Sequence, residues 1–399
     1  MDNMAVARIN GGIITWALKR LGANLESLAT PKVSPATIEA WINGKQFPSE
    51  GQAEDLADRL GIAYAMLYMP EVPPDEPNKT PDLRTIDGRR LSKPSLNLLK
   101  LLDATRARQE WYRDELKSIS TPTLDFVGKF SRHDSPKAIA GDMQNHLLGN
   151  SFKPTEFGNF EDFLKGLATN AEQSGILVMR SALVGHATSR VLDVKEFRGF
   201  VLIDNLAPII FINDNDAKAA QIFTFAHELA HIWIGASGIS DRHPDTKGDS
   251  TNPTEILCDR IAAEFLVPER EFLDVWPRGG DLDHKMWSTG RHFRVSTLVV
   301  LRRAKEFNLI TPTAFFAKVD EQYERYKMRE SAKKEADKHK EKKGGNFWAS
   351  FDLRNSAKFN LAVATSVREQ KTTYAEAGSL FGVAPATAAR YMNRQELNK

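Results

Sequence analysis

The sequence contains only one cysteine, Cys258, among its 399 residues. A single thiol excludes an internal disulfide and a zinc finger built from several thiolates, and it favours a reducing compartment. No apolar run reaches the length of a membrane-spanning helix, and residues 1–20 lack the charged-then-apolar layout of a signal peptide. We therefore expect a cytoplasmic protein with no membrane partner.

An excess of charge of one sign is also absent, since 54 Lys and Arg oppose 52 Asp and Glu, for a formal net charge of +2. The chain as a whole is not a polycation, so any contact with nucleic acid must come from a local patch. Its length predicts more than one domain, and an apolar content of 41% is enough to fill real cores.

Apolar periodicity and turn signals divide the chain into five regions. Short helices are predicted over 1–70, and a proline-rich linker or strap over 71–95. The largest region, 96–320, opens with a long amphipathic helix and continues with short apolar strands and several strong helices. A charged connector at 321–345 and a helical module at 346–399 follow. The predicted fold class is α+β, mostly helical, with a small sheet in the central region.

One short sequence occurs twice. Residues 33–37 read Val-Ser-Pro-Ala-Thr, and residues 383–387 read Val-Ala-Pro-Ala-Thr. Each copy is followed by an aromatic residue and an asparagine at the same spacing, and proline at a helix start fits both. Two interpretations stay open, a common turn-plus-helix-start sequence or a repeated module.

The most specific motif is His227-Glu228-Leu229-Ala230-His231. Helical residues four apart lie one turn apart on the same face, so the imidazoles of His227 and His231 can converge on one ion. Glu228 lies about 100° around the helix, beside the ion, where it can take a proton from metal-bound water. The motif predicts a zinc site of metallopeptidase type with two histidine ligands and a catalytic base.

A catalytic zinc ion needs a third protein ligand and an open fourth position. A third histidine six residues after His231 is absent, because Ser237 occupies that position. Glu255 on the following helix is the expected ligand, and Asp259, one turn later, is expected to orient a ligand histidine. Both acids also fit ordinary roles, as a helix-start charge and a surface acid. Glu264 is a competing ligand and His243 a weaker one.

Three further expectations concern the surroundings of this site. Cys258 is expected to be a core residue that points away from the metal. The apolar hairpin from Val201 to Asn213 is expected to offer an edge strand to an extended peptide, which favours a polypeptide substrate. The oxyanion-stabilising group is not identified. Arg291 and His292 are candidates, but ordinary surface roles suit them better.

These segments resemble the ImmA/IrrE metallopeptidases. The resemblance runs through residues 225–231, the Glu-x-x-Cys-Asp of 255–259 and the Ala-Ala-Glu-Phe-Leu-Val-Pro of 262–268, and it extends over about residues 80 to 399. It implies a zincin-like metallopeptidase domain with zinc held by His227, His231 and Glu255 and with Glu228 as the base. Members of this family act on DNA-binding repressors or regulate stress and mobile-element genes, and some are antitoxins encoded beside toxins.

The N-terminal region resembles a Cro/repressor-type helix-turn-helix bundle. Residues 25–29 match its positioning helix and residues 33–38 the start of its recognition helix, which in such proteins enters the major groove. The resemblance implies DNA contacts from Ser34, Ala36, Thr37 and Lys45. The turn departs from the pattern, because it is one residue short and has no glycine. Residues 1–70 carry six Lys and Arg against seven Asp and Glu, so weak binding, or binding only as a homodimer, is expected.

Residues 346–399 are expected to form a helix-turn-helix-like module. From 353 to 399 it carries seven Lys and Arg against three acids, and it can supply a second contact or a partner surface.

Two functional hypotheses follow. The first is a DNA-binding transcriptional regulator fused to an intracellular zinc endopeptidase that cleaves a regulatory protein such as a repressor. The second is a non-proteolytic DNA-binding repressor or antitoxin that binds a toxin and retains the zinc site. A zinc hydrolase of non-peptide substrates is a third reading, and nothing in the sequence resembles a small-molecule pocket.

Overall fold

The protein is described from a computed structural model. The described residues are 6–21, 23–74, 95–149, 153–186, 190–236, 238–240, 252–338 and 347–397. They form two compact units. The first contains the described parts of 1–84, 89–108 and 183–192, and the second contains the described parts of 109–182 and 193–399. No helix among the described residues is long and apolar enough to cross a membrane.

The first unit is helical, with a core that includes Ile14, Leu28, Trp41 and Leu60. Its elements are α1 (Gly11–Leu21), α2 (Leu25–Leu28), α3 (Pro35–Ile42), α4 (Glu50–Leu60), the 3-10 helix η1 (Tyr64–Tyr68) and the part of α5 (Leu96–Ser118) that ends at Arg108.

Side chains replace the missing glycine in the turn between α2 and α3. The hydroxyl of Thr30 accepts hydrogen bonds from the backbone N–H of Lys32 (3.2 Å) and of Val33 (3.0 Å). Arg59 donates to the carbonyls of Ser27 and Ala29 at the end of α2. These bonds satisfy backbone groups that a helix end leaves open, so the turn closes without a left-handed glycine.

A four-stranded sheet with the order β1-β3-β2-β4 lies in the second unit. Its strands are β1 (Leu177–Ser181), β2 (Gly199–Leu202), β3 (Ile209–Asn213) and β4 (Gly238–Ser240). Strands β1 and β3 are parallel, whereas β2 is antiparallel to both β3 and β4. Every residue of β1, β2 and β3 is buried, as expected for strands covered on both faces.

The expectation that the β2–β3 hairpin presents an edge strand is wrong. Strand β4, which follows the histidine-bearing helix directly, pairs with Gly199, Phe200 and Val201 of β2. This strand has only three residues and no apolar run, so the sequence gives no signal of it.

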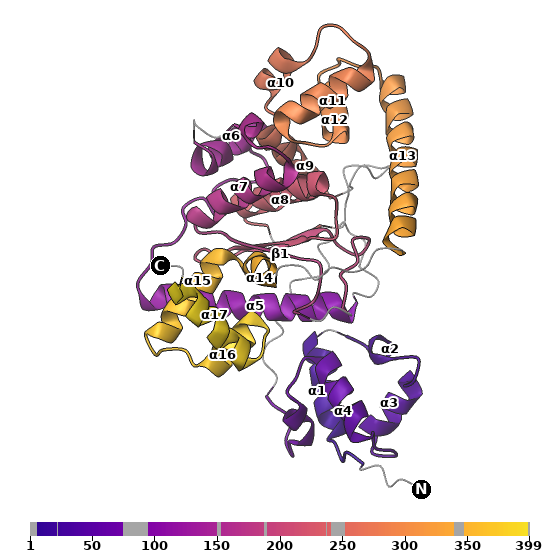
Figure 1. The fold of residues 1–399 in the computed structure, drawn as a ribbon, viewed down its shortest axis with the longest axis vertical. Helices are drawn as coiled ribbons and strands as arrows, with labels where there is room; N and C mark the ends of the chain where they lie inside the picture. Colours follow the sequence, from indigo (N-terminus) through magenta and orange to yellow (C-terminus); the bar gives the residue numbers. More distant parts are fainter. Residues whose placement is uncertain are drawn as a thin grey trace. The chain divides into compact units, whose positions relative to one another are not determined.

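Helices cover both faces of the sheet (Figure 1). Helices α7 (Phe160–Gln173) and α8 (Lys218–Ile234) lie on one side, and α14 (Phe347–Asn355) with the second half of α5 lies on the other. Gln109 of α5 donates to the carbonyls of Leu202 (2.9 Å) and Ala207 (2.8 Å) beside the sheet. Helices α6 (Pro136–Leu147) and α9 (Pro253–Leu266) pack with α8. The remaining elements before α14 are η3 (Pro154–Glu156), α10 (Glu269–Val275), α11 (Leu282–Phe293), α12 (Thr297–Glu306) and α13 (Pro312–Lys338).

The C-terminal helices belong to the same compact unit as the sheet. They are α14, α15 (Ala357–Arg368), α16 (Tyr374–Phe381) and α17 (Pro385–Leu397). The ring of Phe359 packs edge-on against Trp111 of α5 at 5.7 Å between centroids. Lys358 donates to the carbonyl of Glu172 at the end of α7 (2.7 Å). The structure is mostly helical with one small sheet, as predicted.

Several sequence expectations fall outside the described residues. Residues 75–94 hold most of the predicted proline-rich strap, and residues 339–346 hold the end of the charged connector. The earlier part of that connector is helical, because α13 continues to Lys338.

Candidate metal centre

The metal motif lies on α8, which is buried on all sides. Every residue from Ala220 to Trp233 is buried, as expected for a helix in the middle of a core. The helix ends at Gly235, which has the left-handed backbone conformation (φ 68°) typical of a helix end. The backbone of Gly235 lies close to that of Gly128, because a Cβ added to Gly235 would lie only 3.1 Å from the Cα of Gly128. The end of α8 is therefore fixed in position.

Three predicted ligands converge at one point. The Nε2 atom of His227 lies 3.1 Å from Nε2 of His231 and 3.1 Å from Oε2 of Glu255. The Nε2 atom of His231 lies 3.4 Å from Oε1 of Glu255. All three residues are buried, and they form a group that can hold a metal ion. Helix α8 supplies the histidines and the first turn of α9 supplies the carboxylate.

Each histidine is held from behind through its other ring nitrogen. His227 Nδ1 donates to Oδ1 of Asp259 at 2.9 Å, and His231 Nδ1 donates to the carbonyl of Ala236 at 2.7 Å. Because carboxylates and carbonyls only accept, both rings carry the proton on Nδ1 and turn Nε2 toward the shared point. The contact from Asp259 was expected, whereas the Ala236 carbonyl depends on the chain reversal after α8.

The pKa values describe a site that attracts positive charge. Burial opposes a charged imidazole, but hydrogen bonds from His227 to Asp259 and Glu255 raise its pKa well above the ordinary value. The pKa of His231 is also raised despite its burial, through Cys258 and Glu255. Burial acts against ionised Glu255, yet the two histidines hold its pKa well below the usual range. Both shifts favour positive charge beside the buried carboxylate, which a bound cation would also supply.

Glu228 follows His227 on α8 and is fully buried. Its Oε1 atom faces the start of β2, where a Cβ added to Gly199 would lie only 3.2 Å from it. The same Cβ would lie 2.6 Å from Cγ2 of Thr224 and 3.0 Å from the carbonyl oxygen of Phe211. Only a glycine therefore leaves room for the Glu228 carboxylate at this strand. Gly199 is not among the predicted site residues, although a glycine within an apolar strand is a signal of close approach.

The competing candidates lie elsewhere or play other roles. Glu264 forms an ion pair with Arg303, whose side chain is only 3% exposed, and so is occupied away from the cluster. His292 pairs with Glu271 (2.8 Å), and Arg291 stacks over the ring of Trp287. His243 lies outside the described residues.

Cys258 is buried, as expected for a core residue. The expectation that it points away is wrong, because its thiol lies beside His231.

The predicted DNA-contacting residues lie at α3 of the first unit. Ser34 caps this helix by accepting from the backbone N–H of Thr37 (3.2 Å), and the two hydroxyls lie 2.9 Å apart. Ala36 and Lys45 are exposed. Contact with DNA by these four residues stays a prediction.

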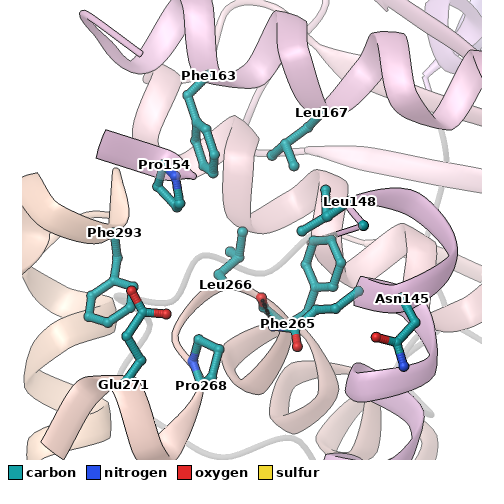
Figure 2. Close-up of a pocket in the computed structure, with 12 residues that line it drawn as sticks. Asn145, Leu148, Pro154, Phe163, Leu167, Phe265, Leu266, Pro268, Glu271 and Phe293 are labelled. Carbon is teal, nitrogen blue, oxygen red and sulfur yellow. Dashed lines mark hydrogen bonds between the residues drawn. The ribbon is translucent and has the colours of Figure 1, made fainter. Parts of the chain in front are cut away.

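A pocket of about 240 Å³ lies apart from the metal ligands (Figure 2). Its wall includes Leu148, Phe163, Phe265, Pro268 and Phe293. Leu148 directly follows α6, Phe163 lies on α7, Phe265 lies near the end of α9, Pro268 directly precedes α10, and Phe293 ends α11. Glu255 lies at the opposite end of α9. The pocket is therefore not the site of the metal chemistry.

Part of the chain is similar to a known protein family. Residues 171–305 match the peptidase family model described as the IrrE N-terminal-like domain, a span that contains α8, α9 and every residue of the cluster. No curated protein matches the chain. The similarity of residues 171–305 to this domain and the buried His-His-Glu cluster together support a metallopeptidase-type enzyme.

Proposed function

We propose that this protein is a zinc endopeptidase fused to a DNA-binding regulatory module, and that it cleaves a regulatory protein such as a repressor. One observation carries the proposal: His227, His231 and Glu255 meet at a single point, and the buried Glu228 follows His227 on the same helix. Ligands about 2.0–2.1 Å from a tetrahedral zinc ion lie roughly 3.3 Å from one another. The ligand-atom separations of 3.1, 3.1 and 3.4 Å suit such an ion.

The proposed chemistry assigns each residue a role. His227, His231 and Glu255 would hold a zinc ion, which would supply Lewis-acid chemistry to a scissile carbonyl and to the attacking water. Glu228 would take a proton from the attacking water and return it to the leaving nitrogen. Asp259 and the Ala236 carbonyl keep both imidazoles oriented. A site that only stabilised the fold would have no use for a carboxylate at position 228.

Support for a regulatory role comes from the first unit. Helices α2, of four residues, and α3, of eight, follow one another here, with Asn24 and Ser34 capping their starts, and this is the order that a helix-turn-helix pair requires. We propose that Ser34, Ala36, Thr37 and Lys45 contact DNA and that the protein acts in the cytoplasm, where the second unit meets a DNA-bound protein substrate. We propose that the protein binds as a homodimer, because two copies of the first unit on one duplex would compensate for the weak binding of a single unit with nearly balanced charge.

The test compares wild type with Glu228→Gln in the source cells and in purified form. Elemental analysis should find one zinc ion per chain in both. Mass spectrometry of newly formed protein N-termini should reveal cleavage products with wild type, and Glu228→Gln should form them about 10²- to 10⁴-fold more slowly. Glu54→Gln, an exposed acid on α4, is the matched control and should cleave normally. Equal amounts of cleavage product from wild type and Glu228→Gln would overturn the peptidase proposal.

The alternative is a non-proteolytic repressor or antitoxin that retains the zinc site. The complete burial of Glu228 favours it in one respect, since a substrate must reach that carboxylate. The same variant decides between the two, because regulation that survives Glu228→Gln with zinc still bound points to the alternative. Capture of an uncleaved partner by Glu228→Gln, but not by wild type, points to the peptidase.

A further inference from the structure

Two helix pairs of the second unit share one local geometry. In the first, α11 ends at Arg294 in the left-handed conformation (φ 53°), and the N–H of Val295 donates to the carbonyl of Gly290 (3.1 Å). In the second, α16 ends at Gly382 (φ 71°), and the N–H of Val383 donates to the carbonyl of Gly378 (2.8 Å). The next helix starts two residues after each valine.

The two pairs correspond residue by residue. A Cβ on Gly290 would lie 3.0 Å from the Val295 carbonyl oxygen, and a Cβ on Gly378 would lie 2.8 Å from that of Val383. The phenylalanines that end α11 and α16 are both buried, as are Val300 and Ala388 of the following helices. Both pairs, α11 with α12 and α16 with α17, are therefore helix-turn-helix pairs with the same close approach at the turn.

Their outer faces differ. In α12 the first-turn residues Leu298, Val299 and Val300 are buried. Helix α13 packs on α12, with Gln322 3.4 Å from Thr297. In α17 the corresponding first turn is open, because Ala386 is exposed and Thr387 is half-buried. The first pair is thus part of the core, whereas the second leaves its second helix available.

The open face of α17 is basic. Arg390 and Arg394 are exposed one turn apart, and Arg390 donates to the hydroxyl of Thr387 (3.1 Å) on the same face. In α3 of the first unit, the repeated motif of residues 33–37 leads instead to Glu39, which is exposed. Phosphate neutralisation supplies much of the affinity of proteins for DNA, so α17 is better suited than α3 to supply it.

Tyr391 anchors α17 in the core of the module, and Arg394 lies 6.0 Å over the ring of Trp348. The ring of Tyr391 packs on Phe351 (4.7 Å) and on Phe381 (5.5 Å), and its hydroxyl donates to Asp352 (2.9 Å). These contacts lie on the buried side of the helix. The exposed side is left for a partner.

We propose that α16 and α17 form a second DNA-binding surface, with duplex DNA as its ligand. The small residues Ala384, Pro385 and Ala386 allow the start of α17 to enter the major groove. Arg390, one turn further, reaches a base edge or a phosphate, and Arg394 binds a phosphate. Tyr374, 49% exposed at the start of α16, can donate to the sugar-phosphate backbone. This inference needs neither peptidase activity nor DNA contact by α3.

The test uses the full chain and a fluorescent mixed-sequence duplex of about two helical turns, titrated over a range of salt concentrations. Arg390→Ala/Arg394→Ala should lower the slope of log affinity against log salt by about two and weaken binding tenfold or more at low salt. Arg390→Lys/Arg394→Lys keeps both charges and should keep most of the slope. Arg270→Ala/Arg278→Ala, two exposed arginines on and after α10, removes the same charge and should bind as wild type.

The remaining outcomes separate this surface from the proposed function. An unchanged salt slope in Arg390→Ala/Arg394→Ala would overturn the inference. A complete loss of duplex binding in Lys45→Ala would also overturn it, because the first unit would then supply all of the affinity. Glu228→Gln should bind the duplex as wild type does, whether or not it cleaves protein.

Discussion

Asp259 lies 2.9 Å from Nδ1 of His227, one helical turn after Glu255, so that two acids of α9 contact the same imidazole through its two nitrogens. Glu255 faces Nε2 and the cluster, whereas Asp259 accepts the proton on the far side of the ring. The spacing of four residues on α9 thus matches the width of an imidazole on α8. This relationship ties the two helices together at the site.

Asp259→Asn should lower zinc affinity about 10- to 100-fold, which is typical for the loss of an outer partner of a metal-ligating histidine. The amide can present an N–H to Nδ1 and so favour the tautomer that places the proton on Nε2, where it opposes coordination. Competition with a zinc chelator measures the change. Asp274→Asn, an exposed acid on α10, is the control. Equal affinities in the two variants would show that Asp259 does not orient His227.

Zinc affinity should rise with pH through and beyond neutrality. The pKa values of His227 and His231 are raised in the metal-free protein, so zinc must displace protons that are still bound at pH 7. A histidine whose pKa is raised in the folded state stabilises the fold. This contribution is complete below the ordinary histidine pKa of about 6.5, and it is lost as the pH rises through the raised pKa. The metal-free protein should therefore lose stability above neutral pH, and the zinc-loaded protein should lose less.

Titration calorimetry in buffers of different ionisation heat measures the protons released on zinc binding, and thermal melts with and without chelator measure the stability. Zinc binding that releases no protons near neutral pH would contradict this account.

The metal ligands could be predicted from the sequence because their geometry is local. His227 and His231 need only a helix to meet, and the apolar residues around them indicate that the helix is buried. Glu255 required one further step, a carboxylate at the start of the next helix. The helix bounds were also predictable, since Gly235 and Pro253 mark the relevant ends.

The rest of the site depends on contacts between distant segments. The approach of Gly199 to Glu228 arises only when β2 pairs with β3 and lies against α8. The Ala236 carbonyl meets His231 because the chain reverses at Gly235. Glu264 resembled a ligand in the sequence because its partner, Arg303, lies on a different helix. Periodicity carries no information about such pairings.

The two acids of α9 should behave differently toward zinc. Glu255→Gln should remove most of the bound zinc, because it replaces a carboxylate of the cluster with a neutral amide. Glu264→Gln should retain zinc, but it leaves the buried Arg303 guanidinium with Glu306 as its remaining carboxylate partner and should destabilise the fold by about 1–3 kcal/mol. Elemental analysis and urea unfolding of both variants give the comparison. Loss of zinc in Glu264→Gln with its retention in Glu255→Gln would reverse the ligand assignment.

Gly199→Ala tests whether the room at the start of β2 serves Glu228. The new methyl group would contact Thr224 and the backbone oxygen of Phe211 at distances that require the structure to shift, which should cost about 1–3 kcal/mol of unfolding free energy. It would also press on the Glu228 carboxylate, so proteolysis should fall further than the loss of folded protein explains, while zinc stays bound. Gly141→Ala is the matched control, since its methyl group meets nothing within 4 Å in α6 and alanine should stabilise that helix by roughly 0.5–1 kcal/mol. If Gly199→Ala cleaved as fast per folded molecule as Gly141→Ala, the Glu228 carboxylate would not depend on this glycine.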